Sequence, residues 1–133
     1  MSLEVLVHIL TALAGVVVVL TRLRLRVEGG AGLLNLHTGA GVLALVAWIA
    51  FLVAGEETPV GGSLAGIVAL GLWWITVMTG LLLLVRWLPS RGRHATPVEK
   101  GTWSKGPGLS ILAHVGLLVC VLVFTFAYLT AAV

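Results

Sequence analysis

Residues 33–54 read LLNLHTGAGVLALVAWIAFLVA, a continuous run without a lysine, an arginine or an acidic side chain. A helix of this length spans about 30 Å, which matches the hydrocarbon thickness of a bilayer. The run therefore predicts a membrane-spanning helix. It carries one histidine, His37, about one turn from its start.

Three further apolar stretches accompany it, at about residues 3–20, 64–88 and 109–133. Segments rich in glycine or proline separate the four, at residues 29–32, 59–62 and 89–107. The apolar–polar alternation typical of strands is absent, so we expect an all-α protein. The prediction is one domain, residues 1–133, folded as an integral membrane four-helix up-down bundle. The composition agrees, because only 10% of the residues are charged, against about 25% in soluble domains.

The charged residues predict the orientation of this bundle. The connection between the second and third spans carries Glu56 and Glu57 and no cation. All lysines and arginines lie in or beside the other two connections: Arg22, Arg24, Arg26, Arg86, Arg91, Arg93, Lys100 and Lys105. Because cytoplasmic loops are enriched in such residues, we expect both termini on the non-cytoplasmic side.

Topology and lipid headgroups account for these cations, so we do not expect nucleic acid as a partner of this protein. The composition, rich in alanine, valine, leucine and glycine, and the compact loops are typical of bacterial proteins. We therefore expect a multi-pass protein of the inner cell membrane.

Histidines within the spans are functional candidates, since ionisable groups are costly inside a membrane. His37 and His114 each follow the start of their helix by about one turn, which places both roughly 6 to 8 Å below the same face. The second and fourth helices of an up-down bundle lie diagonally across its core. The two imidazoles can therefore face each other and ligate the iron of one haem b from both sides.

Neighbouring residues fit a haem pocket. Gly41, one turn after His37, leaves room for a flat ring, and Trp48 projects from nearly the same face three turns further on. Arg22 and Arg86 are the arginines nearest the spans, and arginine binds carboxylates such as the haem propionates. A hydrogen bond between the histidines' helices, another metal, and ordinary packing by the glycine remain alternatives.

His8 lies in the first span, toward the other face. The third span has no histidine, methionine or cysteine at the matching depth, near residues 67–70. We expect a local hydrogen bond for His8, while a quinone, a proton relay and a haem shared with another subunit remain alternatives. Small residues spaced four apart, Gly62 with Gly66 and Ala40 with Ala44, predict close helix packing.

With its histidines and the segment LHTGAG at residues 36–41, the chain resembles the transmembrane cytochrome b proteins with a four-helix core, such as the ascorbate-reducible di-haem cytochromes. That family holds two haems, one by histidines on helices 1 and 3 and one on helices 2 and 4. His37 and His114 match the second pair, and His8 matches one member of the first, so the resemblance implies one haem b per chain. Thr79 and Gly80 are similar to a pair in cytochrome b subunits of bacterial oxidoreductases. Half of a haem A synthase would show a similar pair of histidines.

The predicted function is that of a b-type membrane cytochrome carrying out one-electron transfer, as an electron-transfer protein or oxidoreductase subunit rather than a stand-alone enzyme. Its candidate partners, besides the lipid bilayer, are a quinone, a partner redox subunit and a second copy of the chain. Two alternatives compete with this prediction. One is a haem-free accessory subunit of a larger membrane complex, and the other is a membrane enzyme that modifies haem or quinone.

Overall fold

The computed structural model describes the backbone of residues 1–24, 32–94 and 107–133, and the side chains of residues 1–20, 32–86 and 111–133. Four helices make up these ranges, and no strand occurs in them: α1 (Leu3–Arg24), α2 (Gly32–Val53), α3 (Ser63–His94) and α4 (Pro107–Leu129). All four are long and apolar enough to cross a membrane. The predicted all-α membrane bundle is therefore confirmed.

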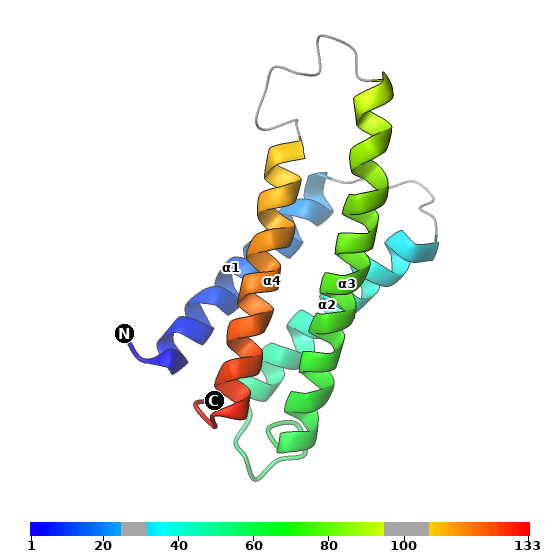
Figure 1. The fold of residues 1–133 in the computed structure, drawn as a ribbon. Coiled ribbons are helices and arrows are strands. Elements are labelled where there is room, and N and C mark those ends of the chain that lie inside the picture. Colours follow the sequence, from blue (N-terminus) through cyan, green and yellow to red (C-terminus); the bar gives the residue numbers. More distant parts are fainter. Residues whose placement is uncertain (25–31, 95–106) are drawn as a thin grey trace.

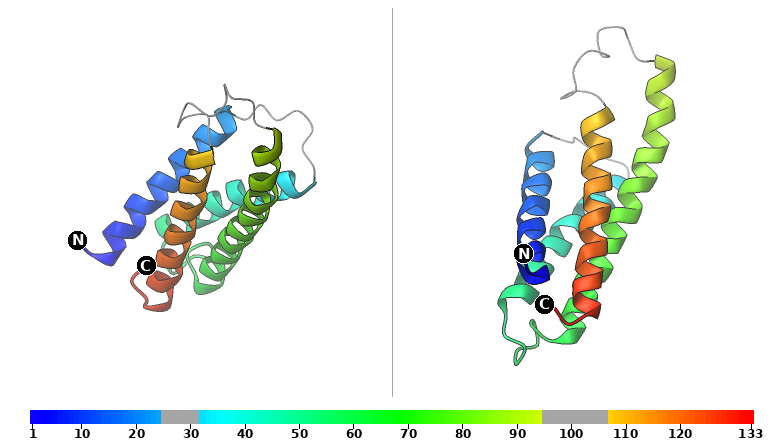
Figure 2. Two further views of the ribbon diagram at one scale, coloured as in Figure 1. Left: turned by 45° about the horizontal axis from the view of Figure 1, so that its top comes forward. Right: turned by 60° about the vertical axis from the view of Figure 1, so that its left-hand side comes forward.

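The helices run alternately up and down. Both termini lie at the same end of the bundle as the connection between α2 and α3, and the end of α1 and the start of α4 lie at the other end (Figure 1). Each helix adjoins its neighbours in chain order, and α1 also adjoins α4, whereas α2 and α4 do not adjoin. The ring α1–α2–α3–α4 therefore places α2 diagonally opposite α4, as expected. The two further views agree that α3 and α4 run side by side (Figure 2).

The outer surface of the bundle is apolar as well as its interior, unlike that of a soluble protein. Large apolar side chains such as Leu43, Val46 and Val85 lie on the outer surface, where lipid rather than water would cover them. Aromatic and small residues fill the interior. Trp48, Trp73 and Phe124 are completely buried, and close ring contacts join Trp48 to Phe124 and Phe124 to Trp73.

Small residues allow the helices to approach closely, as their spacing predicts. Ala40 and Ala44 are buried in α2. A Cβ atom at Gly66 would lie 2.5 Å from Cε2 of Tyr128 and 3.0 Å from Cε2 of Phe51. Gly62 is different, because its nearest neighbours are backbone oxygens of its own turn. Among the two predicted glycines, only Gly66 lies at a contact between helices.

Two helix ends differ from the prediction. We expected the third helix to end near residue 88, yet α3 continues past Pro89 to His94. Proline costs a helix one hydrogen bond, and this cost is small beyond the membrane because water can bond the freed carbonyl.

The fourth helix was expected to reach residue 133 but ends at Leu129. There Ala131 adopts a positive φ of 50°. The N–H groups of Ala132 and Ala131 bond back to the carbonyls of Ala127 and Tyr128, which is the Schellman arrangement that closes a helix.

A buried hydrogen bond joins α1 to α2, the least extensive of the helix interfaces. Nε1 of Trp48 donates to Oγ1 of Thr11 at 3.1 Å, and that hydroxyl donates to the carbonyl of Val7. Thr11→Val keeps the shape of the side chain but leaves a buried indole N–H without an acceptor. We expect it to destabilise the fold by about 1 kcal/mol, seen as a lower unfolding temperature in mild detergent.

The matched control for this prediction is Thr38→Val. Among the described residues, the Thr38 hydroxyl bonds only to the carbonyl of Leu34 within its own helix, so its loss should leave the unfolding temperature nearly unchanged. Equal unfolding temperatures for the two variants would contradict the role assigned to the bond between Trp48 and Thr11.

Candidate functional site

His37 and His114 meet inside the bundle, although they belong to helices that do not adjoin. Their ring centres lie 5.8 Å apart, and their ring planes are only 19° from parallel. Both side chains are half-buried. We expected these imidazoles to come together because they lie at similar depths on diagonal helices, and they do.

The carbonyl of Thr76 orients the first imidazole. Nδ1 of His37 lies 2.9 Å from this carbonyl oxygen on α3. Because a carbonyl oxygen only accepts, Nδ1 must carry the proton and donate it, which leaves a lone pair on Nε2. Metal-bound histidines in proteins generally donate their second ring N–H in this way, and the bond fixes the ring orientation.

The hydroxyl of Thr79, also on α3, lies close to this hydrogen bond. Oγ1 of Thr79 donates to the carbonyls of Ile75 and Thr76, and it lies 3.4 Å from Nδ1 of His37. Thr76 and Thr79 are both buried. The polar atoms on this side of His37 are therefore satisfied within the protein, as a low-dielectric interior requires.

Gly80 closes the site on the α3 side. A Cβ atom at this position would lie 2.7 Å from Cε1 of His37, 2.9 Å from Cδ2 of His114 and 3.2 Å from Nε2 of His114. Any side chain here would collide with both rings. Only glycine lets the α3 backbone border the gap between them.

The separation of the rings suits two ligands of one metal. Two imidazoles bound on opposite sides of one metal ion, each nitrogen about 2 Å from it, would have ring centres roughly 6 Å apart. The observed 5.8 Å matches this distance, although the two rings are stacked rather than aligned through their nitrogen edges. Among the described side chains, no group of three or more histidine, cysteine or acidic residues could hold a metal ion.

The other residues predicted to line the haem pocket do not all lie beside the histidine pair. Gly41 allows a close approach of α3, since a Cβ atom there would lie 3.3 Å from Cγ2 of Thr76. Trp48 lies deeper, in the buried aromatic layer, and its N–H is used by Thr11. Arg86 is exposed, six residues beyond Gly80 on α3. The side chain of Arg22 lies outside the described residues.

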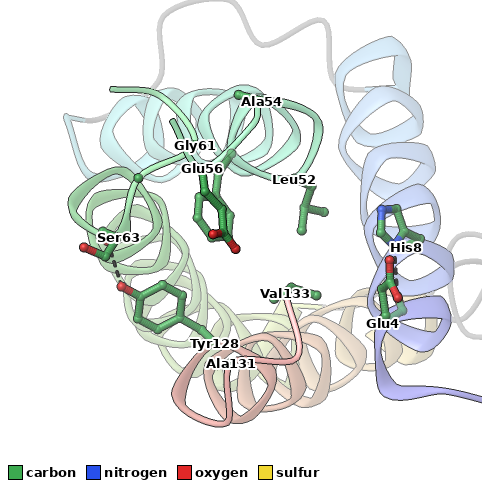
Figure 3. A pocket seen from close by; sticks show the side chains of 12 residues that line it. Glu4, His8, Leu52, Ala54, Glu56, Gly61, Ser63, Tyr128, Ala131 and Val133 are labelled. Atoms are coloured by element: carbon green, nitrogen blue, oxygen red, sulfur yellow. Dashed lines mark hydrogen bonds between the residues drawn. The ribbon is translucent and has the colours of Figure 1, made fainter. Parts of the chain in front are cut away.

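His8 lies in α1, away from this pair. Its Nδ1 is 2.9 Å from the carbonyl oxygen of Glu4, one turn earlier in the same helix. The expected local hydrogen bond is confirmed. His8 also lines a pocket at the end of the bundle where the termini lie (Figure 3).

The buried aromatic layer separates the histidine pair from that end. Trp48 and Phe124 stack at 5.0 Å between ring centres, and Trp73 and Phe124 lie 6.0 Å apart. The indole N–H of Trp73 has no hydrogen-bond partner in the described part of the chain. These aromatic rings therefore lie between the histidine pair and the end of the bundle where the termini lie.

Sequence reasoning missed Thr76 and gave Gly80 only as part of a resemblance. The acceptor at Thr76 is a backbone carbonyl, which has no residue signature. For Gly80 a signal existed, because it lies in the third span about six residues before the end of that span, near the depth of both histidines. Comparisons of the chain with protein-family models, with curated proteins and with solved structures find no match.

The contact at Gly80 gives a direct test of the site. Gly80→Ala must displace both imidazoles or the α3 backbone, and such overpacking costs about 1 to 3 kcal/mol. We expect a clearly lower unfolding temperature in detergent. Gly116→Ala is the matched control, because a Cβ atom at Gly116 would meet nothing within 4 Å and alanine favours a helix. A Gly80→Ala variant as stable as Gly116→Ala would contradict the described packing.

Proposed function

We propose that this protein is a b-type membrane cytochrome that transfers single electrons, with one haem held between α2 and α4 by His37 and His114. The observation that carries the proposal is the near-parallel imidazole pair at 5.8 Å, at the separation two axial ligands need. The bond from His37 to the Thr76 carbonyl supports it, since it leaves Nε2 with a free lone pair.

Haem, when bound, supplies reversible one-electron chemistry between its ferric and ferrous forms. The protein would bind the haem, orient its histidine ligands and shield it from water. The Thr76 carbonyl holds the His37 ring and raises its basicity. His37 and His114 would hold the haem, and ligation by two imidazoles favours electron transfer over oxygen binding. The aromatic layer excludes water from the inner side of the pocket.

Gly80 and Arg86 have distinct roles in this proposal. A porphyrin is wider than the gap that Gly80 borders, so haem binding requires α3 to move away from the histidine pair. Gly80 presents no side chain that would have to be cleared, but the same movement would also shift the Thr76 carbonyl that bonds His37. Arg86 is exposed near the end of the span, where its guanidinium can bind a propionate. Arg22 would serve the same purpose from α1.

The orientation and location of the protein belong to the same proposal. In the sequence the cations lie in and beside the first and third connections, and Glu56 and Glu57 lie in the second. By the positive-inside rule, the pair would lie near the cytoplasmic face of an inner bacterial membrane, with both termini outside. Electron donors or acceptors would then be a quinone in the bilayer or a redox subunit at the basic face.

The absorption spectrum of detergent-purified protein, expressed with haem supplied, tests the function. We expect a Soret band with sharp α and β bands on reduction. His37→Ala and His114→Ala should each remove these bands, because one remaining imidazole cannot hold low-spin haem in a dry pocket. His8→Ala should retain them. A folded but colourless protein, or loss of haem in His8→Ala alone, would overturn the ligand assignment.

Labelling of single cysteines tests the orientation. With the buried Cys120 replaced by alanine, Glu57→Cys should react with a membrane-impermeant thiol reagent in intact cells, since Glu57 is exposed beside the α2–α3 connection. Arg86→Cys should react only after the cells are opened. The reverse pattern would place the histidine pair on the outer side.

A further inference from the structure

Thr79 places a hydroxyl against the protonated ring nitrogen of His37. Its Oγ1 lies 3.4 Å from Nδ1 of His37 and 3.2 Å from the carbonyl oxygen of Thr76. That carbonyl accepts the Nδ1–H of His37 at 2.9 Å, so three polar atoms form one cluster between α2 and α3. Thr79 is 8% exposed and Thr76 3%, which places the cluster in the interior of the protein.

The direction of the hydroxyl proton determines what Oγ1 of Thr79 can do. A hydroxyl has one proton to donate and two lone pairs with which to accept. The contact of Oγ1 with the Ile75 carbonyl is 2.7 Å, shorter than the 3.2 Å contact with the Thr76 carbonyl. The proton therefore lies mainly toward Ile75, and a lone pair is left for the Nδ1–H of His37.

The Nδ1–H of His37 thus has two acceptors. The Thr76 carbonyl at 2.9 Å is the primary one, because hydrogen bonds of this type are usually about 2.7 to 3.2 Å long. The Thr79 hydroxyl at 3.4 Å is the longer, secondary contact of a three-centre hydrogen bond. Both acceptors belong to one turn of α3, so a movement of that helix carries them together. Such contacts have a larger electrostatic effect in a low-dielectric interior than in water.

We propose that Thr79 is a positioning residue that lowers the reduction potential of the haem iron through His37. This inference rests on the proposed function, because it requires that His37 ligates a haem. A hydrogen bond from the second ring N–H makes an imidazole a more basic ligand, and a more basic ligand stabilises ferric iron more than ferrous iron. Hydrogen bonding around the ligands is one of the means by which proteins set the potential of a haem.

The two acceptors differ in what a substitution can change. The Thr76 carbonyl belongs to the backbone and is kept in every variant at that position. The Thr79 hydroxyl is the part of the three-centre bond that the side chain supplies. Thr79→Val removes this hydroxyl and keeps the shape of the side chain. Thr76→Val is the matched control, because the Thr76 hydroxyl donates to the Leu72 carbonyl of its own helix, while the carbonyl that bonds His37 stays in place.

Redox titration of the haem-loaded protein in detergent, followed at the α band, measures the effect. We expect Thr79→Val to raise the ratio of ferrous to ferric haem about threefold at a fixed potential, because a long hydrogen bond is lost. This corresponds to a midpoint potential higher by about 30 mV, at 59 mV per tenfold change for one electron. Thr79→Ser, which keeps the hydroxyl, and Thr76→Val should titrate like the unaltered protein.

A second measurement needs no haem. In haem-free protein labelled with ¹⁵N-histidine, the resonance of the Nδ1-bound proton of His37 reports the strength of its hydrogen bonds, and His37→Ala assigns it. We expect Thr79→Val to move this resonance upfield, and Thr76→Val to leave it in place. A resonance unchanged by Thr79→Val would show that the hydroxyl is not an acceptor, which overturns the inference.

The spectrum of the unaltered protein separates this inference from the proposed function. A protein with the expected haem bands, but with equal midpoint potentials for Thr79→Val and Thr76→Val, would overturn the role of Thr79 and leave the ligand assignment intact. A colourless protein would overturn the proposed function itself. If circular dichroism shows that Thr79→Val does not fold, Thr79→Ala is compared with Thr79→Ser, since both lack the methyl group and only one has the hydroxyl. The same rise in potential is expected from serine to alanine, and equal potentials would overturn the inference.

Discussion

The hydrogen bond from His37 to the Thr76 carbonyl is the interaction on which the site depends. It is made between α2 and α3, the most extensive helix interface, and it fixes both the tautomer and the direction of the imidazole. Gly41 and Gly80 make it possible. The first lets Thr76 approach α2, and the second lets the α3 backbone border both histidine rings. Without these contacts His37 would be free to turn, and the pairing with His114 across the diagonal would not be defined.

A membrane explains the division of the molecule into two different ends. The interior of the bundle is small and aromatic, so it can exclude water while lipid covers the apolar outer surface. Among the described side chains, charged groups lie at the helix ends: Arg86 near the end of α3 that lies on the side of the histidine pair, and Glu4 and Glu56 at the other end. The buried aromatic layer keeps them apart.

Much of this arrangement could be predicted from the sequence, because it depends on length and periodicity. The runs at residues 3–20 and 33–54 closely match α1 and α2, and the depths of His37 and His114 predicted that they would meet. The rest depends on features without a residue signature. Neither the carbonyl of Thr76 nor the rotation of α3 that turns Gly80 toward the rings can be read from composition. The extension of α3 past Pro89 ran against proline's usual effect, and Ala131 closes α4 in a position where glycine is expected.

Electron paramagnetic resonance of the oxidised, purified protein tests the central claim most directly, since the ferric signal reports the ligands of the iron. Two imidazoles fixed as described would give a low-spin ferric spectrum, and the signal would change to high-spin or vanish when either His37 or His114 is removed. A high-spin spectrum in the unaltered protein, or a low-spin spectrum that survives loss of His114, would contradict the account.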